Sequence, residues 1–192
     1  VNIIGHPDIW DAKYVVRGGQ EAYNGIPFSR QELEDMGANF SLSAEPVWVT
    51  ADVVTSGEVP MVTGYEQIDS YLFVKEQGRL VPDRFRVDLA LIIKTGVGLV
   101  VVLGCAHRGM VNTLLRAREI TGVDRVHTVV GGTHLVTASQ ERVMRTVEAI
   151  KQLGVQRLGV SHCTGLPAAT VLARELGDVF FFNSAGSRIT VP

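Results

Sequence analysis

Three histidines stand at equivalent places in this sequence, each just after a short apolar stretch. His107 lies in GCAHRG after LVVVL, His134 lies in GGTHL after HTVV, and His162 lies in SHCTG after RLGV. Each has glycine or another small residue beside it, which lets a backbone or a ligand come close. Neutral imidazole is a favoured ligand for zinc, iron and related metals. A single such histidine is more often a hydrogen-bonded loop residue, but three in equivalent positions favour one shared metal site.

The elements around these histidines alternate in type along the chain. Apolar stretches with the composition of strands are followed by segments in which apolar residues recur at helical spacing. This order predicts helices packed over a largely buried sheet, which is the α/β class. If the strands are parallel neighbours, their carboxyl ends bring the histidines to one edge. The expected strands are 99–103, 126–130, 157–160 and 179–182, and the expected helices are 109–120, 140–153 and 167–176.

The first half of the chain predicts shorter elements. We expect a strand at 1–4 and, because Pro7 suits a first helical turn, a short helix at 8–14. Ser29 and Glu32 have the spacing of a capping box, which predicts a helix through Met36 that stops at Gly37. Two further features complete this half: strands joined by turns within 39–74, and a hairpin of 88–94 with 99–103.

A phosphate loop is the competing interpretation of the segment around His107. Gly104 and Gly109 have the GxxxxG frame between a strand and a helix, but Met110 and Val111 stand where lysine and serine or threonine belong. Nucleotide binding of that type is therefore not expected. The free N–H groups of the helix that begins near Gly109 would still favour an anionic substrate group.

Other polar residues have weaker claims to the site. Cys105 and Cys163 flank two of the histidines and could lie near a metal, although their type favours small buried apolar residues. His127 begins a strand without a glycine neighbour, which favours a structural role. Asp88 and Glu58 are the carboxylates closest to this pattern, and both are more often hydrogen-bond acceptors at turns or strand ends.

Composition limits the class of protein. The chain has 192 residues, 46% hydrophobic residues and a formal net charge of -2, which predicts a single globular domain over 1–192 and no nucleic-acid partner. The longest apolar run, 96–105, is too short to cross a membrane, and no polybasic patch occurs. Two cysteines suit a reducing compartment, so we expect a cytoplasmic protein. The absence of an initial methionine suggests a truncated or processed product.

The motifs around the histidines, taken in order, resemble one protein family. GCAHRGMVNTL, VVGGTHL and SHCTG, with TSGEVP (55–60) and VPDRFRVDLALII (81–93), are similar to one branch of the metallo-β-lactamase superfamily. That branch includes dihydropterin-ribofuranosylaminobenzene-phosphate synthases and related uncharacterised metal-dependent hydrolases. The resemblance covers nearly the whole chain and is specific for the branch, though not for a substrate.

The resemblance implies an αββα sandwich with a site for one or two divalent metal ions, zinc foremost and iron or manganese as alternatives. In this comparison His107 completes the first metal site and His162 serves the second. The bridging aspartate of the superfamily would fall near Gly132, where this chain has no carboxylate. His134 lies two residues further on, so it is either a substitute ligand or a substrate-facing acid, and both roles stay open.

The chain departs from the family at its beginning. The HxHxDH motif, which supplies most metal ligands in the family, does not occur, and GHPD (5–8) resembles the segment that follows it, where the histidine has a structural role. The chain therefore resembles the C-terminal part of an incomplete domain. A missing N-terminal half or an oligomer partner would complete it, and apolar sheet surface would be exposed without that half.

These features predict a metal-dependent hydrolase or related transferase acting on a small anionic substrate. His107, His134 and His162 would bind metal, with His134 as the catalytic alternative, while the expected substrate contacts are Gly109, Asn112 and Thr164. The alternative is a non-catalytic fragment, or a half-domain completed by a partner, that binds metal only weakly. Whether this chain is itself an enzyme stays open.

Overall fold

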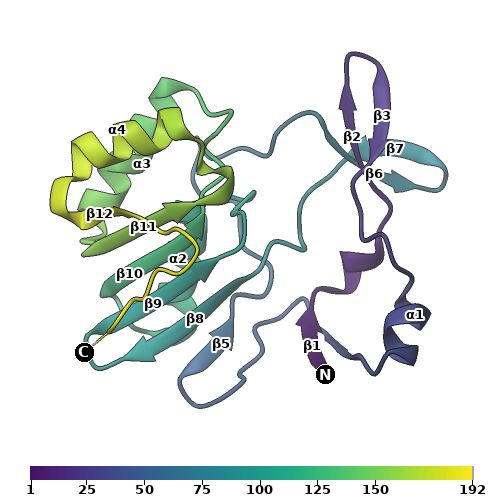
Figure 1. Cartoon of the computed structure of the whole chain (residues 1–192), viewed down its shortest axis with the longest axis horizontal. Coiled ribbons are helices and arrows are strands. Elements are labelled where there is room, and N and C mark those ends of the chain that lie inside the picture. The colour runs from purple at the N-terminus through teal and green to yellow at the C-terminus, as the bar shows by residue number, and fades with distance from the viewer. Residues whose placement is uncertain (192) are drawn as a thin grey trace.

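A six-stranded sheet forms the centre of the molecule, in a computed structural model that describes residues 1–191 (Figure 1). The first four strands in spatial order are parallel, and the last two continue the sheet in antiparallel pairing. The order is β12 (Phe180–Phe182), β11 (Arg157–Ser161), β10 (Val126–Gly132), β9 (Gly98–Leu103), β8 (Ala90–Thr95) and β5 (Val53–Thr55). The predicted α/β class and the hairpin of β8 with β9 are confirmed.

Three helices cover one face of this central sheet. They are α2 (Met110–Thr121), α3 (Gln140–Gln152) and α4 (Leu166–Leu176), and α3 contacts both of the others. Each connects two neighbouring parallel strands, so their apolar sides pack on one core with Val101 and Leu158 of the sheet. The predicted positions of these helices and of their strands are correct to within a few residues, because long periodic segments fix the element type.

The opposite face of the central sheet is covered unevenly. Val101 and Val102 are neighbours on β9 and point to opposite faces. Val101 is fully buried among the helices, whereas Val102 is 37% exposed. Val130 of β10, which pairs with Val102, is buried. On the central strands of this face, apolar surface is therefore exposed at Val102 of β9 but not at the neighbouring Val130 of β10.

The N-terminal half builds two smaller sheets. β1 (Asn2–Gly5) pairs in parallel with β4 (Asn39–Leu42). A four-stranded antiparallel sheet stands apart from the central sheet in Figure 1. Its spatial order is β3 (Gln20–Tyr23), β2 (Lys13–Arg17), β6 (Leu72–Glu76) and β7 (Arg79–Pro82).

The helix expected over residues 8–14 is wrong beyond its first turn. Only a 3-10 turn, η1 (Pro7–Trp10), forms there, and Lys13 and Tyr14 begin β2. Tyr14, Val15 and Val16 are aromatic or β-branched, and β2 pairs with both β3 and β6. Such side chains favour a pleated strand, so pairing with a segment almost 60 residues away decides the conformation.

The predicted capping box is confirmed at α1 (Arg30–Asp35). The Ser29 hydroxyl accepts from the Glu32 backbone N–H, and the Glu32 carboxylate accepts from the Ser29 backbone N–H. Gly37 follows the helix with a φ of 91°, a left-handed conformation that favours glycine. Local sequence therefore specifies this short helix.

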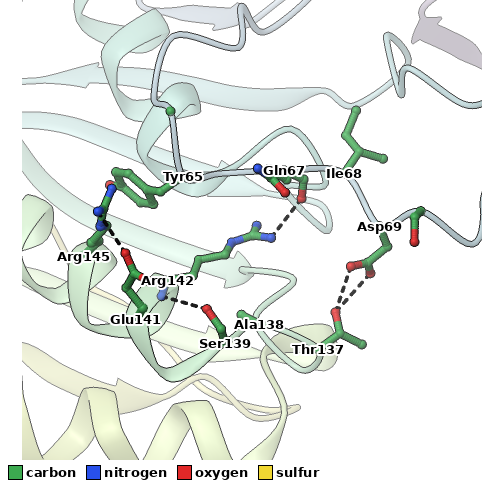
Figure 2. A pocket seen from close by; sticks show the side chains of 12 residues that line it. Tyr65, Gln67, Ile68, Asp69, Thr137, Ala138, Ser139, Glu141, Arg142 and Arg145 are labelled. Carbon is green, nitrogen blue, oxygen red and sulfur yellow. Dashed lines mark hydrogen bonds and ion pairs between the residues drawn. The ribbon is translucent and has the colours of Figure 1, made fainter.

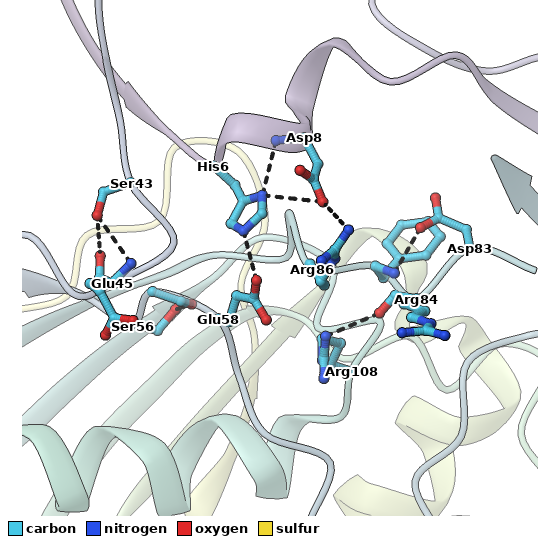
Figure 3. Close-up of polar contacts among 12 residues, drawn as sticks. His6, Asp8, Ser43, Glu45, Ser56, Glu58, Asp83, Arg84, Arg86 and Arg108 are labelled. Carbon is cyan, nitrogen blue, oxygen red and sulfur yellow. Dashed lines mark hydrogen bonds and ion pairs between the residues drawn. The ribbon is translucent and has the colours of Figure 1, made fainter. Parts of the chain in front are cut away.

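His6 ties the N-terminal segment to the loop that follows β5 (Figure 3). Its Nδ1 accepts from the Asp8 backbone N–H, so the proton is on Nε2, which donates to Glu58 at 3.0 Å. Asp8 also forms an ion pair of 2.8 Å with Arg86. His6 is buried, and these contacts agree with the structural role expected of this His-Pro segment. Among residues 1–191, no helix has the length and apolar character needed to span a membrane.

Candidate metal centre

The three histidines meet at the carboxyl edge of the parallel strands. β9, β10 and β11 are adjacent and parallel, so their carboxyl ends lie side by side. His107 follows β9 in a loop, His134 lies two residues past the last residue of β10, and His162 directly follows β11. The predicted placement at strand ends therefore holds for all three, and sheet order brings them to one edge.

The imidazole of His107 contacts two other rings. Phe85 stacks on it at 3.9 Å between ring centroids, and the His134 ring lies at the same distance, tilted by 40°. Burial lowers the pKa of His107 to about 4, and His134 adds to this effect. His107 is therefore neutral near pH 7, which is the form of imidazole that binds metal.

Asp69 orients His134 from a distant part of the chain. Its Oδ2 lies 2.9 Å from His134 Nε2, and the same carboxylate accepts from the hydroxyl groups of Tyr71 at 2.6 Å and Thr137 at 3.0 Å. Asp69 was not predicted as a site residue, because it lies 65 residues before His134 in a segment without a recognisable motif. No pattern in the sequence marks it.

This contact determines which nitrogen of His134 is free. With a carboxylate at Nε2, the Nε2 atom carries the proton, and in the neutral ring Nδ1 then holds a lone pair. Nδ1 of His134 and Nδ1 of His107 are both buried and form no hydrogen bond by distance and angle, although the Cys163 sulfur lies near enough to His134 to raise the pKa of its ring. Two buried nitrogens on adjacent rings are costly unless something binds them. This donor pair fits a metal ion.

A second group of donor atoms lies at the same edge. The sulfur atoms of Cys105 and Cys163 and one ring nitrogen of His162 all lie within 4.8 Å of one another, and both cysteines are free. The neighbouring Cys105 thiol lowers the pKa of Cys163 to about 4, while that of Cys105 is raised. The pKa of His134 is also raised, first by the Cys163 sulfur and then by Asp69. The cysteines are thus part of this edge, not small residues of the apolar core.

The backbone at this edge adopts unusual conformations. His134 and His162 have φ values of 48° and 52°, and Ala106, which precedes His107, has 51°. Phe85, which stacks on His107, has 47°. Residues other than glycine rarely occupy this left-handed region, and such strain is concentrated at functional sites. The surrounding structure holds these side chains in place at a cost in stability.

The position expected for the superfamily's aspartate has no room for a side chain. A Cβ atom on Gly132 would lie 2.7 Å from both the Cys163 sulfur and the Gly104 carbonyl oxygen. Asp88 is the nearby carboxylate: it accepts from the Arg108 backbone N–H at 2.9 Å, and burial raises its pKa to about 6. Cys163 therefore occupies the space that a carboxylate at residue 132 would need.

The three residues expected to contact substrate have internal neighbours. Gly109 precedes α2 with a φ of 102°, packed against the Glu66 side chain. The Asn112 amide accepts from the backbone N–H groups of Val62 and Thr63 and donates to the Arg108 carbonyl. Thr164 is also buried, and its hydroxyl is hydrogen-bonded to Thr133 and Ser161. The contact of these three residues with substrate stays a prediction.

The residues expected to be structural lie away from the three histidines. His127 is at the start of β10, at the end opposite His134, and its Nδ1 lies 2.8 Å from the Thr128 hydroxyl. Glu58 holds His6, as described above. Neither contacts the site histidines.

No family model matches the chain. It is 32% identical, over 193 aligned residues, to the 7,8-dihydropterin-6-methyl-4-(β-D-ribofuranosyl)-aminobenzene-5'-phosphate synthase of Methanocaldococcus jannaschii, covering 98% of this chain and 66% of that protein. It is 28% identical to the uncharacterized protein MJ0448 of the same organism, covering 90% of this chain and 62% of the relative. The chain thus spans just under two thirds of the curated relatives it matches.

A solved structure has the same fold. The crystal structure of Tm1679, described as a metal-dependent hydrolase of the β-lactamase superfamily, matches with a TM-score of 0.86 and 27% sequence identity. The match covers 99% of this chain and 71% of that structure. The agreement therefore extends over the N-terminal sheets as well as the central sheet.

Proposed function

The chain belongs to the metallo-β-lactamase superfamily, and from this membership we propose that it carries part of the metal site of a hydrolase or related transferase. The observation that carries the proposal is the pair of adjacent imidazoles, His107 and His134, whose ring centroids lie 3.9 Å apart and whose buried Nδ1 atoms form no hydrogen bond by distance and angle. Together with His162 they would hold a divalent metal ion, zinc foremost, with iron or manganese as alternatives. The superfamily fold and the description of Tm1679 support metal dependence.

The bound metal would polarise a substrate oxygen and lower the pKa of a bound water. The side chains of this protein would position the metal ligands. Asp69 accepts the Nε2 proton of His134 and fixes the ring, so Nδ1 faces the site as a ligand. In the alternative role, His134 is protonated on both nitrogens, which its raised pKa favours, and Nδ1 donates a proton to the substrate.

The substrate is proposed to be a small anionic molecule. One relative is named as the synthase of a 5'-phosphate compound, which supports a phosphorylated substrate. We further propose a reducing, cytoplasmic setting, because both cysteines are free and lie beside His162. A net charge of -2 gives no support for a nucleic-acid partner.

A second candidate is a half-domain without activity of its own. HxHxDH is absent from the sequence, and the chain spans 66% and 62% of its two relatives. In this case an N-terminal half or an oligomer partner would supply the remaining ligands. The histidines of this chain would then bind metal weakly until the partner docks.

The test compares His107→Ala with His127→Ala. Zinc and manganese affinities of the chain are measured by competition with a chromophoric chelator. Removing a ligand should weaken zinc binding by at least about tenfold, whereas His127→Ala should leave it unchanged. Unfolding midpoints show that both variants are folded. Equal zinc affinity for wild type and His107→Ala would contradict the proposed site.

A further inference from the structure

A pocket of about 470 Å³ lies between the segment 64–70 and the beginning of α3 (Figure 2). We name it the Arg142 pocket, after the residue at its floor. Asp69 and Thr137 line one side of it, and these two residues also form the contacts that hold His134 in place. The pocket therefore adjoins the histidine edge without containing the histidines.

Arg142 is a buried cation with most of its hydrogen-bonding capacity unused. The residue is 9% exposed, and its one side-chain hydrogen bond runs from Nη1 to the Gln67 carbonyl at 2.9 Å. Its Nε and Nη2 are buried without a partner, and no carboxylate within residues 1–191 forms an ion pair with it. The buried Glu66 carboxylate lies near enough for Arg142 to offset part of the rise that burial causes in its pKa, but it forms no ion pair with Arg142, so Arg142 keeps buried donors that an anion would satisfy.

The other charged groups of the pocket are already paired. Arg145 forms an ion pair with Glu141 at 2.9 Å near the surface. The Asp69 carboxylate is used by His134, Tyr71 and Thr137. Arg142 is therefore the unpaired charge, and the pocket as built would attract a negative group.

Two further features of the pocket could donate hydrogen bonds, although the Ser139 hydroxyl already accepts from the Arg142 backbone N–H. The Tyr65 hydroxyl is buried without a partner, and burial raises its pKa to about 12, so it keeps its proton near neutral pH. Ala138 and Ser139 at the beginning of the 13-residue helix α3 also line the pocket. The N-terminus of a helix carries free N–H groups and a partial positive charge.

We propose that the Arg142 pocket binds a phosphate-like oxyanion of the substrate, with Arg142 as the residue that neutralises it. Guanidinium forms strong charge-assisted hydrogen bonds with such groups, and its planar donors match two oxygens at once. As a binding site on this chain it needs no metal. As a substrate site it rests on the proposed function: the anion would anchor one end of the molecule beside Asp69 and direct the remainder toward His134.

The test is calorimetric titration of inorganic phosphate into the metal-free chain at constant ionic strength, with chloride as the balancing anion. Arg142→Gln should weaken phosphate binding by at least about tenfold, because it removes the charge and most donors. Arg174→Gln, at an exposed position of α4 paired with Glu175, is the matched control and should leave binding unchanged. Equal binding by Arg142→Gln and wild type, or no phosphate binding by the wild type, overturns the proposal.

Weaker phosphate binding by Arg142→Gln could also come from a damaged fold, and Glu141→Gln is the variant that separates the two causes. It removes a negative charge from the pocket lining and leaves Arg142 in place. Phosphate should then bind about two- to threefold more tightly, a gain that a damaged fold cannot produce. Unchanged or weaker binding would count against an anion at this pocket.

The two proposals fail in different experiments. The phosphate titration contains no metal, whereas the comparison of His107→Ala with His127→Ala reads zinc affinity alone. Phosphate binding that depends on Arg142 supports the pocket even where His107→Ala binds zinc normally. Zinc binding that depends on His107, with no phosphate binding, overturns the pocket alone.

Discussion

The side chain of Asp69 determines how His134 can act. Its carboxylate accepts a hydrogen bond from Nε2 of His134. Nδ1 is then the ring nitrogen left for the site, where His107 and Cys163 are the neighbours of the ring. Partners of metal-binding histidines usually orient the ring and raise its basicity. At the residue scale, the proposed metal site would therefore depend on a side chain that is not itself a ligand.

Replacing Asp69 should weaken metal binding even though it is not a ligand. We expect Asp69→Ala to weaken zinc affinity about 10- to 100-fold, because the ring loses its orienting acceptor. Asp69→Asn keeps a neutral acceptor and should weaken it less. Asp124→Asn, at a side chain that is 90% exposed, is the control. Zinc affinity unaffected by Asp69→Ala would show that His134 is positioned by other contacts.

At the scale of elements, a side chain from a distant segment caps α2. Gly109 offers no capping side chain, and Glu66 instead accepts from the backbone N–H groups of Val111 and Asn112 at 2.9 and 2.8 Å. Glu66 is 3% exposed and also accepts from the Thr63 hydroxyl. The segment 64–70, which forms one wall of the Arg142 pocket, is thereby fixed to the helix that follows His107.

Glu66 should give stability a defined pH dependence. Burial raises its pKa above the ordinary 4.5, so the folded protein holds this proton more tightly than the unfolded chain. The contribution of this titration to stability is full below the ordinary pKa and is lost as pH rises through the raised value. Glu66→Gln lacks the titration, so the unfolding free energy of wild type minus variant should fall across that window. Urea unfolding at a series of pH values measures it, and a rising difference would contradict the assignment.

The end of β10 leaves no room for a side chain at residue 132, and this also limits the shape of the site. Gly132 faces the Cys163 sulfur and the Gly104 carbonyl oxygen at distances that no Cβ atom tolerates. The strands approach closely here because residue 132 has no side chain.

Restoring the superfamily's aspartate should therefore damage the protein and not repair it. We expect Gly132→Asp to lower the free energy of unfolding by at least about 3 kcal/mol, because backbone must move to admit it. Gly96→Ala, where nothing lies within 4 Å of the added Cβ, is the control and should change little. Denaturant unfolding gives both values. A Gly132→Asp variant as stable as wild type, with tighter zinc, would show that this edge can open.

At the scale of the whole molecule, the candidate site is drawn from the C-terminal half of the chain. The three histidines come from the parallel part of the central sheet, and HxHxDH is absent from the sequence. The description of residues 1–192 as one incomplete domain stays a prediction. The donor atoms at this edge form two neighbouring sets, Cys105 with His162 and Cys163, and His107 with His134.

The 192-residue chain should retain little metal after treatment with a chelator. Affinity depends on ligand number and geometry, and three histidines without a bridging carboxylate offer an incomplete set. Elemental analysis after dialysis against chelator and then buffer is the measurement, with the untreated chain alongside. Stoichiometric zinc, iron or manganese after this treatment would show that the cysteines complete a tight site.

Local patterns in the sequence predicted the second half of the molecule well. Apolar periodicity over ten or more residues defines α2, α3 and α4, and short β-branched runs define the strands between them, because each signal lies within one element. The histidines follow these strands directly, so their place at the edge follows from strand order. Where the signal was short, as at residues 8–14, the prediction failed because pairing with β6 outweighs local propensity.

The chemical surroundings of the histidines could be decided only by tertiary structure. Asp69 reaches His134, Phe85 covers His107, and Cys163 occupies the space at Gly132, each from a different segment. The unpaired charge of Arg142 likewise becomes visible only when the segment 64–70 closes over α3. Local spacing sets the backbone conformation of an element, but contacts between distant segments depend on how the folded elements pack, which no short window of sequence contains.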